Sequence, residues 1–481
     1  MIIQFLSRYR PRYIRSLVYM LQSCEYNIGD YLAWYWRTKD FSRVERRKQL
    51  VKTPKAIFLL ACAYAVVFLF LIVAYLAFRV APLLSLILLI LAPYTLAYGI
   101  IIPLALINLM QKPIEHVLLW RAKRKLALHK GTRIAIAGSF GKTSMREILK
   151  AVLSEGLPAQ AGKKVASPPF SYNTPLGICR FIEQLKGNEE VLIFELGEYY
   201  PGDVLKLCKL IDPQIGVITG VNEAHLEKFG TLEKTTKTIF ELAQYLKGKS
   251  KEKLLYVNGE NELAQNYASK NHILYSREGT GDCHIKEPKT NLTGASFTLV
   301  MGGKKSTVTS SLLGLHNVGP LAVAAHIGSR LGLTRTQIEE GIRKTRAFNH
   351  RLEANEDKNG VITIDDSYNG NPDGVHAIIE FLTSIKERRR WYVTPGLVEM
   401  GARAEEVHRE IGRRLAKAEI EKVVLIRNSV TSYIEQGLKE AGYSGEVLWF
   451  EDALLAFNAL PHLTVKGDIV LLQNDWPDQY A

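Results

Sequence analysis

The stretch Gly138-Ser139-Phe140-Gly141-Lys142-Thr143-Ser144 decides the fold of this chain. It follows an apolar run at residues 133–137 and precedes the Met-Arg-Glu-Ile-Leu segment at residues 145–149. Glycine residues let backbone N–H groups turn towards phosphate oxygens, and the positive end of a following helix favours bound negative charge. The pattern therefore predicts a strand, a phosphate-binding loop and a helix.

The side chains of this loop point to a nucleoside triphosphate. Lys142 can reach the β- and γ-phosphates, and the Thr143 hydroxyl can ligate Mg²⁺. The loop is shorter than the general phosphate-binding pattern, because Ile136 stands where its first glycine would be. The alternative is a glycine-rich turn with an incidental lysine. The candidate nucleotide-binding residues of the loop are Gly138, Ser139, Gly141, Lys142, Thr143 and Ser144.

Composition and charge describe a folded, basic chain. It has 481 residues, of which 47% are hydrophobic and 23% charged, and a net charge of +14. The basic excess lies entirely before residue 131, beside a strongly apolar region. This distribution favours an anionic membrane surface and predicts no nucleic-acid partner. The 5 cysteines are scattered, so neither a disulfide framework nor a zinc site is predicted.

Two long segments, Ala56–Phe78 and Val80–Met110, carry no charge. Because a helix needs about 20 apolar residues to cross a bilayer, residues 56–110 are predicted to form a transmembrane hairpin of two spans in the cytoplasmic membrane. Basic residues flank both outer ends, which places the termini and the catalytic domains in the cytoplasm. Buried helices of a soluble domain are the alternative.

Two basic segments flank the predicted hairpin. Residues 1–55 are expected to form a basic, partly amphipathic cytoplasmic arm, with a merely solvated arm as the alternative. Residues 111–130 are expected to be a basic linker. The hairpin would therefore be bounded by positive charge on both sides.

From residue 131 onwards, β-type apolar runs alternate with helical stretches, which predicts an α/β fold with largely parallel sheets. A boundary is expected near Ala347–Glu353, between a P-loop central ATPase domain at 131–347 and a Rossmann-like C-terminal domain at 348–481. The predicted strands are Ile134–Ala137, Val191–Leu196, Ile215–Thr219, Leu254–Val257, Val361–Ile364, Trp391–Val393, Val423–Ile426, Val447–Phe450 and Ile469–Leu472.

Further motifs follow the loop in a fixed order. Glu195 ends a predicted strand, where ligands bind in open α/β sheets, and its carboxylate suits Mg²⁺. Taken alone it could be a solvated charge. The other motifs are Ser167–Ile178, Ile218–Gly230, Gly314–Val318, Arg351–Glu353, Asp365–Asp373 and Gly396–Gly401.

Taken in this order, the segments resemble the Mur ligase family, over roughly Gly131–Gly467. Within it they are most similar to the member that adds D-alanyl-D-alanine to a UDP-muramoyl tripeptide. The resemblance implies catalytic roles for Lys142, His225 and Arg351. It implies Mg²⁺ ligation by Thr143, Glu195 and His225; nucleotide contacts from His316, Asn317, Arg351, Asp366, Tyr368 and Asn369; and an acceptor-facing loop of Ser171, Tyr172, Asn173 and Thr174.

The implied activity is an ATP-dependent, ADP-forming carboxylate–amine ligase that acts through an acyl phosphate on a cell-wall precursor peptide, with ATP and Mg²⁺. Such phosphoryl transfer needs mainly positioning and charge neutralisation. The implied partners are a UDP-linked or lipid-linked muramoyl peptide, an amino acid or dipeptide, and the membrane. A poly-γ-glutamate-type polymer ligase and a non-catalytic, membrane-tethered ATP-binding scaffold remain alternatives.

The sequence departs from the family pattern in three places. Ile239 occupies the position of a carbamylated lysine, with Lys237 and Glu241 two residues to either side. The segment 473–478 replaces a C-terminal acceptor-recognition motif. The hairpin stands where the family has its UDP-sugar-binding domain, which suggests a lipid-linked acceptor.

Overall fold

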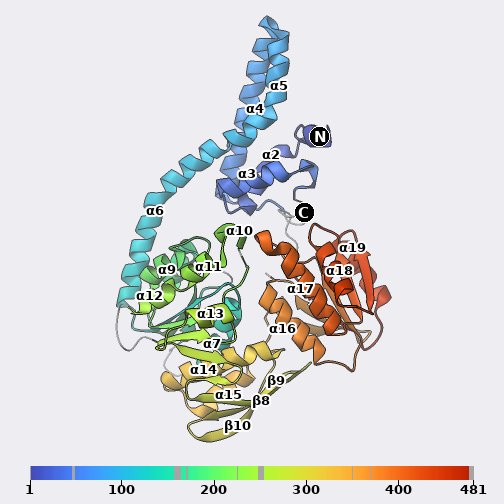
Figure 1. Cartoon of the computed structure of the whole chain (residues 1–481). Helices are drawn as coiled ribbons and strands as arrows, with labels where there is room; N and C mark the ends of the chain where they lie inside the picture. Colours follow the sequence, from blue (N-terminus) through green and yellow to red (C-terminus); the bar gives the residue numbers. More distant parts are fainter. Residues whose placement is uncertain are drawn as a thin grey trace. The chain divides into compact units, whose positions relative to one another are not determined.

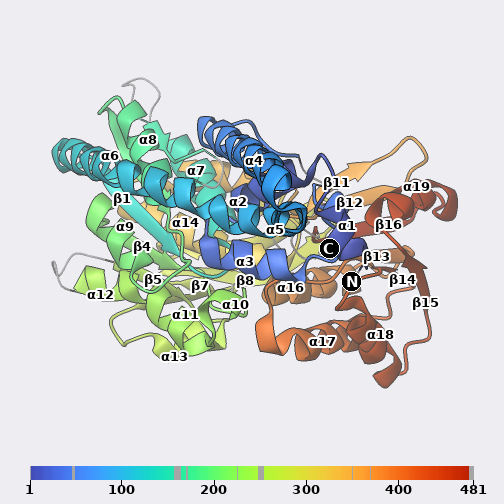
Figure 2. The ribbon, with the colours of Figure 1, turned by 90° about the horizontal axis from the view of Figure 1, so that it is seen from above.

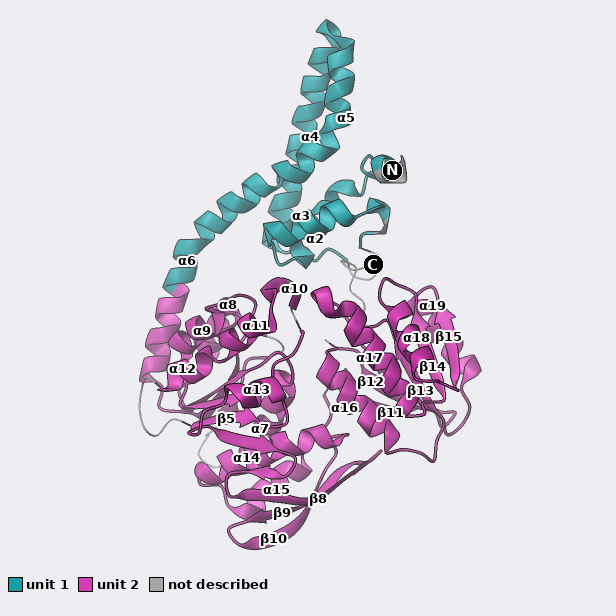
Figure 3. Ribbon diagram, viewed as in Figure 1, with its two compact units in different colours: residues 1–117, 476–481 teal, residues 118–475 magenta. Residues whose placement is uncertain are grey.

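The computed structural model describes residues 2–45, 49–156, 164–169, 172–224, 226–247, 254–348, 350–368 and 370–475. These residues form two compact units, which divide between Val117 and Leu118 (Figure 3). The described parts of residues 1–117 make up the first unit, and those of residues 118–475 make up the second. Each unit is treated by itself below.

The first unit is helical (Figure 1). Its two long helices form an antiparallel hairpin that turns at Ala81, and shorter helices pack at the open end of this hairpin. Pro54–Val80 and the stretch Pro82–Leu128 are long and apolar enough to cross a membrane, by length and composition. The elements are α1 (Ile2–Ser7), α2 (Tyr13–Ser23), α3 (Ile28–Arg37), η1 (Phe41–Arg43), α4 (Pro54–Val80), α5 (Pro82–Gly99) and α6 (Ile101–Leu128), the last of which runs through the expected linker.

The second unit begins with a sheet whose order is β10-β9-β8-β7-β6-β5-β4-β1-β3-β2. The pairs from β2 to β6 are parallel, whereas β6 to β10 form an antiparallel extension that the sequence analysis did not predict. The strands are β1 (Thr132–Ala137), β2 (Lys164–Ala166), β3 (Glu189–Glu195), β4 (Ile215–Ile218), β5 (Leu254–Asn258), β6 (Ile273–Ser276), β7 (Gly279–Thr280), β8 (Cys283–Asn291), β9 (Gly294–Met301) and β10 (Lys304–Ser310).

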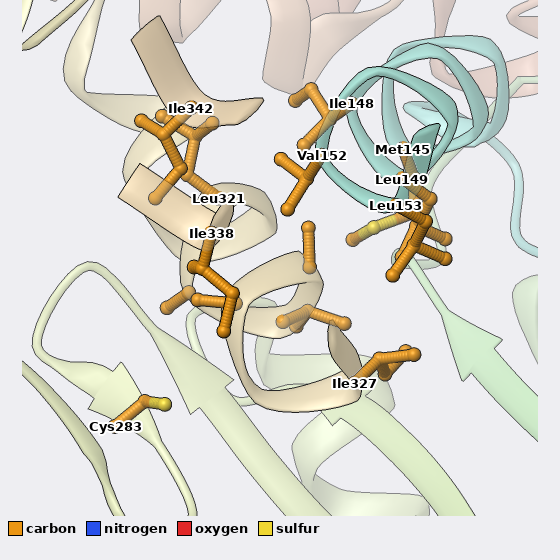
Figure 4. Packing of buried hydrophobic residues seen from close by; sticks show 14 of the residues in the cluster. Met145, Ile148, Leu149, Val152, Leu153, Cys283, Leu321, Ile327, Ile338 and Ile342 are labelled. Atoms are coloured by element: carbon orange, nitrogen blue, oxygen red, sulfur yellow. The ribbon is translucent and has the colours of Figure 1, made fainter. Parts of the chain in front are cut away.

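Helices cover both faces of this sheet. Alternate residues of β1 enter different cores: Ile134 and Ile136 pack with α7 (Lys142–Gly156), whereas Ala135 and Ala137 pack with α8 (Pro175–Gln184). Figure 4 shows the apolar face of α7 against α14 (Val318–Arg330) and α15 (Arg335–Arg343). The remaining helices are α9 (Asp203–Ile211), α10 (Leu226–Phe229), α11 (Leu232–Ile239), α12 (Glu241–Lys247), α13 (Glu262–Tyr267) and η3 (Leu315–Asn317).

The second sheet of this unit has the order β11-β12-β16-β13-β14-β15 and is parallel except for β11. Its α16, α17 and α18 pack on one face and α19 on the other (Figure 2). The elements are β11 (Glu353–Glu356), β12 (Ile362–Asp366), α16 (Pro372–Thr383), β13 (Arg390–Thr394), η4 (Gly401–Arg403), α17 (Ala404–Lys417), β14 (Lys422–Ile426), α18 (Thr431–Glu440), β15 (Glu446–Phe450), α19 (Ala453–Leu463) and β16 (Ile469–Gln473).

The predicted strands all appear, and the α/β class is confirmed. The two sheets share no strand, and the change from one to the other lies between β10 and β11. The domain boundary near Ala347–Glu353 stays a prediction.

Candidate nucleotide-binding site

The loop between β1 and α7 is built around glycine. Gly138 has a φ of +147° and Gly141 a φ of +72°. A Cβ on Gly138 would lie 2.1 Å from Thr219 Oγ1, so no larger residue fits there. The Ser139 N–H donates to the Gly220 carbonyl at 2.9 Å, which holds the loop against the end of β4. The Ser139 hydroxyl is buried and has no hydrogen-bond partner among the described residues.

The start of α7 completes a cradle for an anion. The helix begins at Lys142, directly after the loop, and Ser144 lies in its first turn. The first N–H groups of a helix have no partner within it. Together with the helix dipole, they favour a bound phosphate at this position. The described loop residues therefore fit the phosphates of a nucleotide.

Lys142 is held by a carboxylate that the sequence analysis did not single out. Its Nζ lies 2.5 Å from Glu198 Oε1 and also donates to the Gly138 carbonyl. The Glu198 side chain is only 2% exposed and the Lys142 side chain 13%. The sequence feature that could have indicated Glu198 is its position, because it is a second carboxylate three residues after Glu195, which ends the strand. Phosphate oxygens at this loop would compete with Glu198 for the lysine.

Removing the charge of Glu198 is expected to strengthen nucleotide binding. In a Glu198→Gln variant, Lys142 loses its protein counter-ion and the site loses a negative charge that repels phosphate. We expect the Kd for ATP, measured by titration calorimetry, to fall several-fold. An equal or weaker affinity would show that Glu198 does not compete with phosphate for Lys142.

Glu195 ends β3 beside the loop, as predicted, and its two oxygens have different neighbours. Oε2 accepts a hydrogen bond from the Thr143 hydroxyl at 3.1 Å, and Oε1 lies 2.8 Å from Arg146 Nη1. Burial raises the pKa of Glu195, and the nearby Arg146 and Lys142 cations oppose this shift. The sequence analysis missed Arg146, which lies one helical turn after Lys142 on α7.

The oxygen donors at the loop suit Mg²⁺ bound together with phosphates. Mg²⁺ usually takes one or two carboxylates, phosphate oxygens and water, and Thr143 and Glu195 supply two protein oxygens. His225, the expected ligand of a second metal, lies outside the described residues. Within the described part of the chain, no group of three or more His, Cys, Asp or Glu residues could hold a metal ion.

The Glu195→Gln variant is expected to need more Mg²⁺. The substitution keeps the size of the side chain and an oxygen for Thr143, but removes the charge that favours a divalent cation. We expect the Mg²⁺ concentration for half-maximal ATP turnover to rise, with Glu183→Gln on the exposed face of α8 as the control. An unchanged Mg²⁺ titration would assign Glu195 to the structure of the loop alone.

Arg351, just before β11, interacts electrostatically with Asp366 at the end of β12 and with Glu195 at the end of β3. Asp366 is 5% exposed, and burial raises its pKa to about 7 while the Arg351 cation opposes the shift. Burial lowers the pKa of Arg351, which the Asp366 and Glu195 carboxylates oppose. The Arg351 guanidinium lies 5.4 Å from the centre of the Tyr368 ring. Asn369 lies outside the described residues.

His316 and Asn317 lie together in η3. His316 Nε2 is 3.2 Å from Asn317 Nδ2, which also donates to the Leu313 carbonyl at 2.8 Å. Burial lowers the pKa of His316 to about 4, so its ring is neutral. His316 Nδ1 is buried and makes no hydrogen bond with any described residue. A buried, unmatched ring nitrogen suits a polar edge of a ligand such as a nucleotide base.

The residues of the expected acceptor loop differ in their surroundings, because some make hydrogen bonds within the fold and some are exposed. The Asn173 carbonyl accepts from Gly197 N–H at 3.0 Å, and the Thr174 hydroxyl caps α8 by accepting from Gly177 N–H at 3.3 Å. Tyr172 is exposed. Ser171 lies outside the described residues. The loop is thus fixed beside the end of β3, where Glu195 lies.

Polar contacts join the segment after β4 to the Asp365–Asp373 motif. Asn222 Nδ2 donates to Asn371 Oδ1 at 2.9 Å and to Asp373 Oδ2 at 2.7 Å. Next to it, Glu223 forms an ion pair with Arg403. The motif therefore links the two sheets of the second unit close to the phosphate-binding loop.

The position of the missing lysine is closed to metal chemistry. Ile239 is completely buried in the core beside α9. Lys237, two residues earlier, is 63% exposed and forms a 2.6 Å ion pair with Glu233. Ile239 cannot be carbamylated, and Lys237 is exposed and paired with Glu233 in this structure.

A glycine-rich loop at a strand–helix junction of one α/β sheet, followed in the chain by a second α/β sheet, defines the class as α/β proteins with a P-loop. Two Mur ligase models match the chain: the middle domain over residues 136–328, and the glutamate ligase domain over residues 350–473. The chain therefore belongs to the Mur ligase family.

Curated relatives share this region. The UDP-N-acetylmuramoyl-tripeptide–D-alanyl-D-alanine ligase of Mycobacterium tuberculosis is 29% identical over 66% of this chain and 62% of its own length. That of Bacillus subtilis is 25% identical over 71% of this chain and 73% of its own length. The match thus spans less than two thirds of the mycobacterial relative.

Solved structures share the fold. MurF from Thermotoga maritima, in complex with ADP, has a TM-score of 0.64 and 24% identity, and the alignment covers 75% of this chain and 80% of that one. MurF from Acinetobacter baumannii has a TM-score of 0.64 and 21% identity, and the alignment covers 75% of this chain and 77% of that one.

Proposed function

We propose that this chain is an ATP-dependent, ADP-forming ligase that makes an amide bond in a cell-wall precursor peptide. The observation that supports the proposal is the position of Glu195, which accepts a hydrogen bond from Thr143 and interacts electrostatically with Lys142 and with Arg351 in a Mur ligase fold. Arg351 interacts in turn with Asp366. The names of the curated relatives supply the substrate class: a muramoyl tripeptide as the carboxylate and D-alanyl-D-alanine as the amine.

The proposed chemistry activates a carboxylate that is itself a poor electrophile. ATP, when bound with Mg²⁺, supplies the phosphoryl group that makes the carboxylate an acyl phosphate. ADP is the leaving group of this transfer. The amine then attacks the acyl carbon and loses a proton, and phosphate leaves. Lys142 and Arg351 neutralise charge around the transferring group, and Thr143 and Glu195 hold the metal.

The remaining positions have roles that only the family resemblance supports. Asp366 would accept hydrogen bonds from the ribose, and Tyr368 and Asn369 would line the site on the same side of the nucleotide. His316 and Asn317 would contact the base. His225 would serve a second metal, and the Ser171–Thr174 loop would face the acceptor.

We further propose that the α4–α5 hairpin anchors the ligase in the cytoplasmic membrane, with both termini in the cytoplasm. The length and apolarity of the helices and the basic flanks support this. Anchoring would bring the site to a lipid-linked muramoyl peptide, so a lipid-linked acceptor is preferred over a UDP-linked one.

The test is acceptor-dependent ADP release by the full-length protein in lipid nanodiscs. We expect turnover with D-alanyl-D-alanine and a muramoyl tripeptide, faster with the lipid-linked than with the UDP-linked form. Turnover with L-glutamate alone would instead identify a polymer ligase. ATP binding without turnover on any acceptor would identify a scaffold.

Activity is expected to be independent of bicarbonate. A carbamylated lysine forms from bicarbonate, but Ile239 cannot react and Lys237 is exposed and paired with Glu233. We expect equal ADP release with and without added bicarbonate in carbon-dioxide-depleted buffer, for both the wild type and Lys237→Ala. A bicarbonate requirement that disappears in Lys237→Ala would show that this lysine moves into the site.

A further inference from the structure

Helices α1–α3 cover the open end of the α4–α5 hairpin. Three tyrosine hydroxyls position α1–α3 along α5 by donating hydrogen bonds to its backbone carbonyls. Tyr9 donates to Ile90 at 2.9 Å, Tyr13 to Pro93 at 2.8 Å and Tyr31 to Ala97 at 2.9 Å. In addition, Trp36 Nε1 donates to the Tyr98 hydroxyl at 3.0 Å. One face of the stretch Ile90–Tyr98 of α5, with Pro93, Leu96 and Ala97, therefore lies against protein, whereas Leu91 and Thr95 on the other face are exposed.

The outer surface of this helical cover is charged. Arg10 and Arg12 are exposed and adjoin Tyr9 and Tyr13, which lie at the level of Ile90 and Pro93. Charged side chains in the hydrocarbon of a bilayer are costly and rare. The exposed charged residues of the cover are Arg10, Arg12, Glu25, Arg37 and Lys39. The hydrocarbon is therefore expected to begin beyond Ile90, towards the turn at Ala81.

The length that remains is short. At a rise of about 1.5 Å per residue, the part of α5 from Ile90 to the turn extends roughly 14 Å. The hydrocarbon core of a bilayer is about 30 Å thick. Exposed apolar side chains surround this tip, among them Leu71, Ile72, Leu76, Phe78, Leu83 and Leu86. The tip beyond Ile90 thus has about the depth of one leaflet, and exposed apolar side chains continue outside it on α4, α5 and α6, among them Phe58, Leu91 and Leu106.

We propose that the hairpin enters only the cytoplasmic leaflet of an anionic phospholipid bilayer, with α1–α3 seated among the headgroups. This rests on the proposed membrane anchor and replaces the two spans that hydropathy alone predicts. Tyr9 is 43% exposed at the level of Ile90, as is typical of an aromatic residue at a membrane interface. Trp36 and Tyr98, which are 55% and 44% exposed, lie about 12 Å farther from the tip along α5. Arg10 and Arg12 would meet the anionic headgroups.

Arg79, close to the tip, is the charge that opposes this arrangement. It lies over the Tyr75 ring, 5.6 Å from its centre. Two spans would place Arg79 at the far interface, but they would immerse several charges of the α1–α3 cover in hydrocarbon. A single-leaflet hairpin immerses Arg79 alone. The cost of an immersed charge is greatest near the bilayer centre, where Arg79 would lie, and smaller where a long side chain snorkels to the interface. The shallow arrangement is favoured because it immerses one charge and not several.

The accessibility of the tip tests the depth. We would label Ala81→Cys with a membrane-impermeant maleimide, in spheroplasts and in inside-out vesicles, and subtract the wild-type labelling of the native cysteines. Lys112→Cys, at an exposed position of α6, is the control. We expect Ala81→Cys to react only after detergent is added, and Lys112→Cys to react in inside-out vesicles.

Labelling of Ala81→Cys in spheroplasts would establish two spans and overturn the proposal. Labelling in inside-out vesicles without detergent would show that the tip does not enter the bilayer, and would also overturn it. Recovery of the wild type in the soluble fraction would refute the anchor itself, whereas the ligase assay tests the activity independently.

Arg79 offers a second measurement. With Arg79 in the hydrocarbon, Arg79→Leu should leave a larger fraction of the protein in the membrane after alkaline extraction, whereas Lys112→Leu should not change this fraction. An unchanged fraction in Arg79→Leu would contradict the shallow placement.

Discussion

The Lys142→Ala variant is expected to lose at least about 10²- to 10³-fold in ATP turnover. The loop lysine lies at the start of α7, where it can neutralise charge on the phosphates, and removing a comparable electrostatic contact from an enzyme site typically has this effect. The measurement is the steady-state rate of ADP release at saturating Mg²⁺ and acceptor.

Lys150→Ala is the matched control, because this lysine lies on the same helix but is exposed. It should leave the rate unchanged. Near-normal turnover in Lys142→Ala would refute the assignment of the phosphate site, since no other residue of the loop carries a positive charge.

Arg351→Ala is expected to lower ATP turnover by about 10²-fold or more, because it removes the positive charge that the region of the second sheet contributes to the site. Arg351 comes from the segment before β11 yet interacts with both Asp366 and Glu195, so it carries positive charge from the second sheet to the loop. Arg351→Lys should recover part of the rate, because it keeps the charge but not the planar, forked donor group.

The Arg351 result needs a check of folding, because the variant leaves Asp366 buried without its cation. Thermal unfolding of the variant and of Arg343→Ala, an exposed arginine on α15, separates loss of fold from loss of function. Full turnover in a folded Arg351→Ala variant would exclude this arginine from phosphoryl transfer.

The loop and its flanking strand and helix could be predicted from the sequence because each step has a local cause. The apolar run of β1, the two glycines and the helix-forming residues of α7 follow one another without interruption. Glu195 was found for the same reason, since it closes an apolar strand. These features depend on neighbours in the chain.

Other features depend on contacts between distant residues, and the sequence analysis missed them. β8 contains Lys286, Glu287 and Lys289, so its strand character comes from pairing with β9 and not from an apolar run. Likewise, the neighbouring sequence does not indicate that Glu198 forms an ion pair with Lys142, because 56 positions separate the two residues. The predictions for His225, Asn369 and Ser171 stay untested, since these residues lie outside the described part.

The helix that contains the end of the second apolar segment continues into the expected linker. Hydropathy indicates whether a segment prefers an apolar or an aqueous environment. It does not indicate where its helix ends. The apolar run ends at Met110, but α6 continues to Leu128 through residues that were expected to form a linker. Its basic and polar side chains are compatible with a helix exposed to water.

If Asp366 accepts hydrogen bonds from the ribose, as proposed, the buried carboxyl group at the end of β12 would make nucleotide capture a proton-linked equilibrium. With a pKa of about 7, Asp366 is half protonated near neutral pH. Hydrogen bonds donated by ribose hydroxyls would favour its ionised form, so a fraction of a proton would be released to the buffer for each nucleotide taken up. The affinity would then increase as the pH rises through neutrality, and acidification would by itself lower the occupancy of the site.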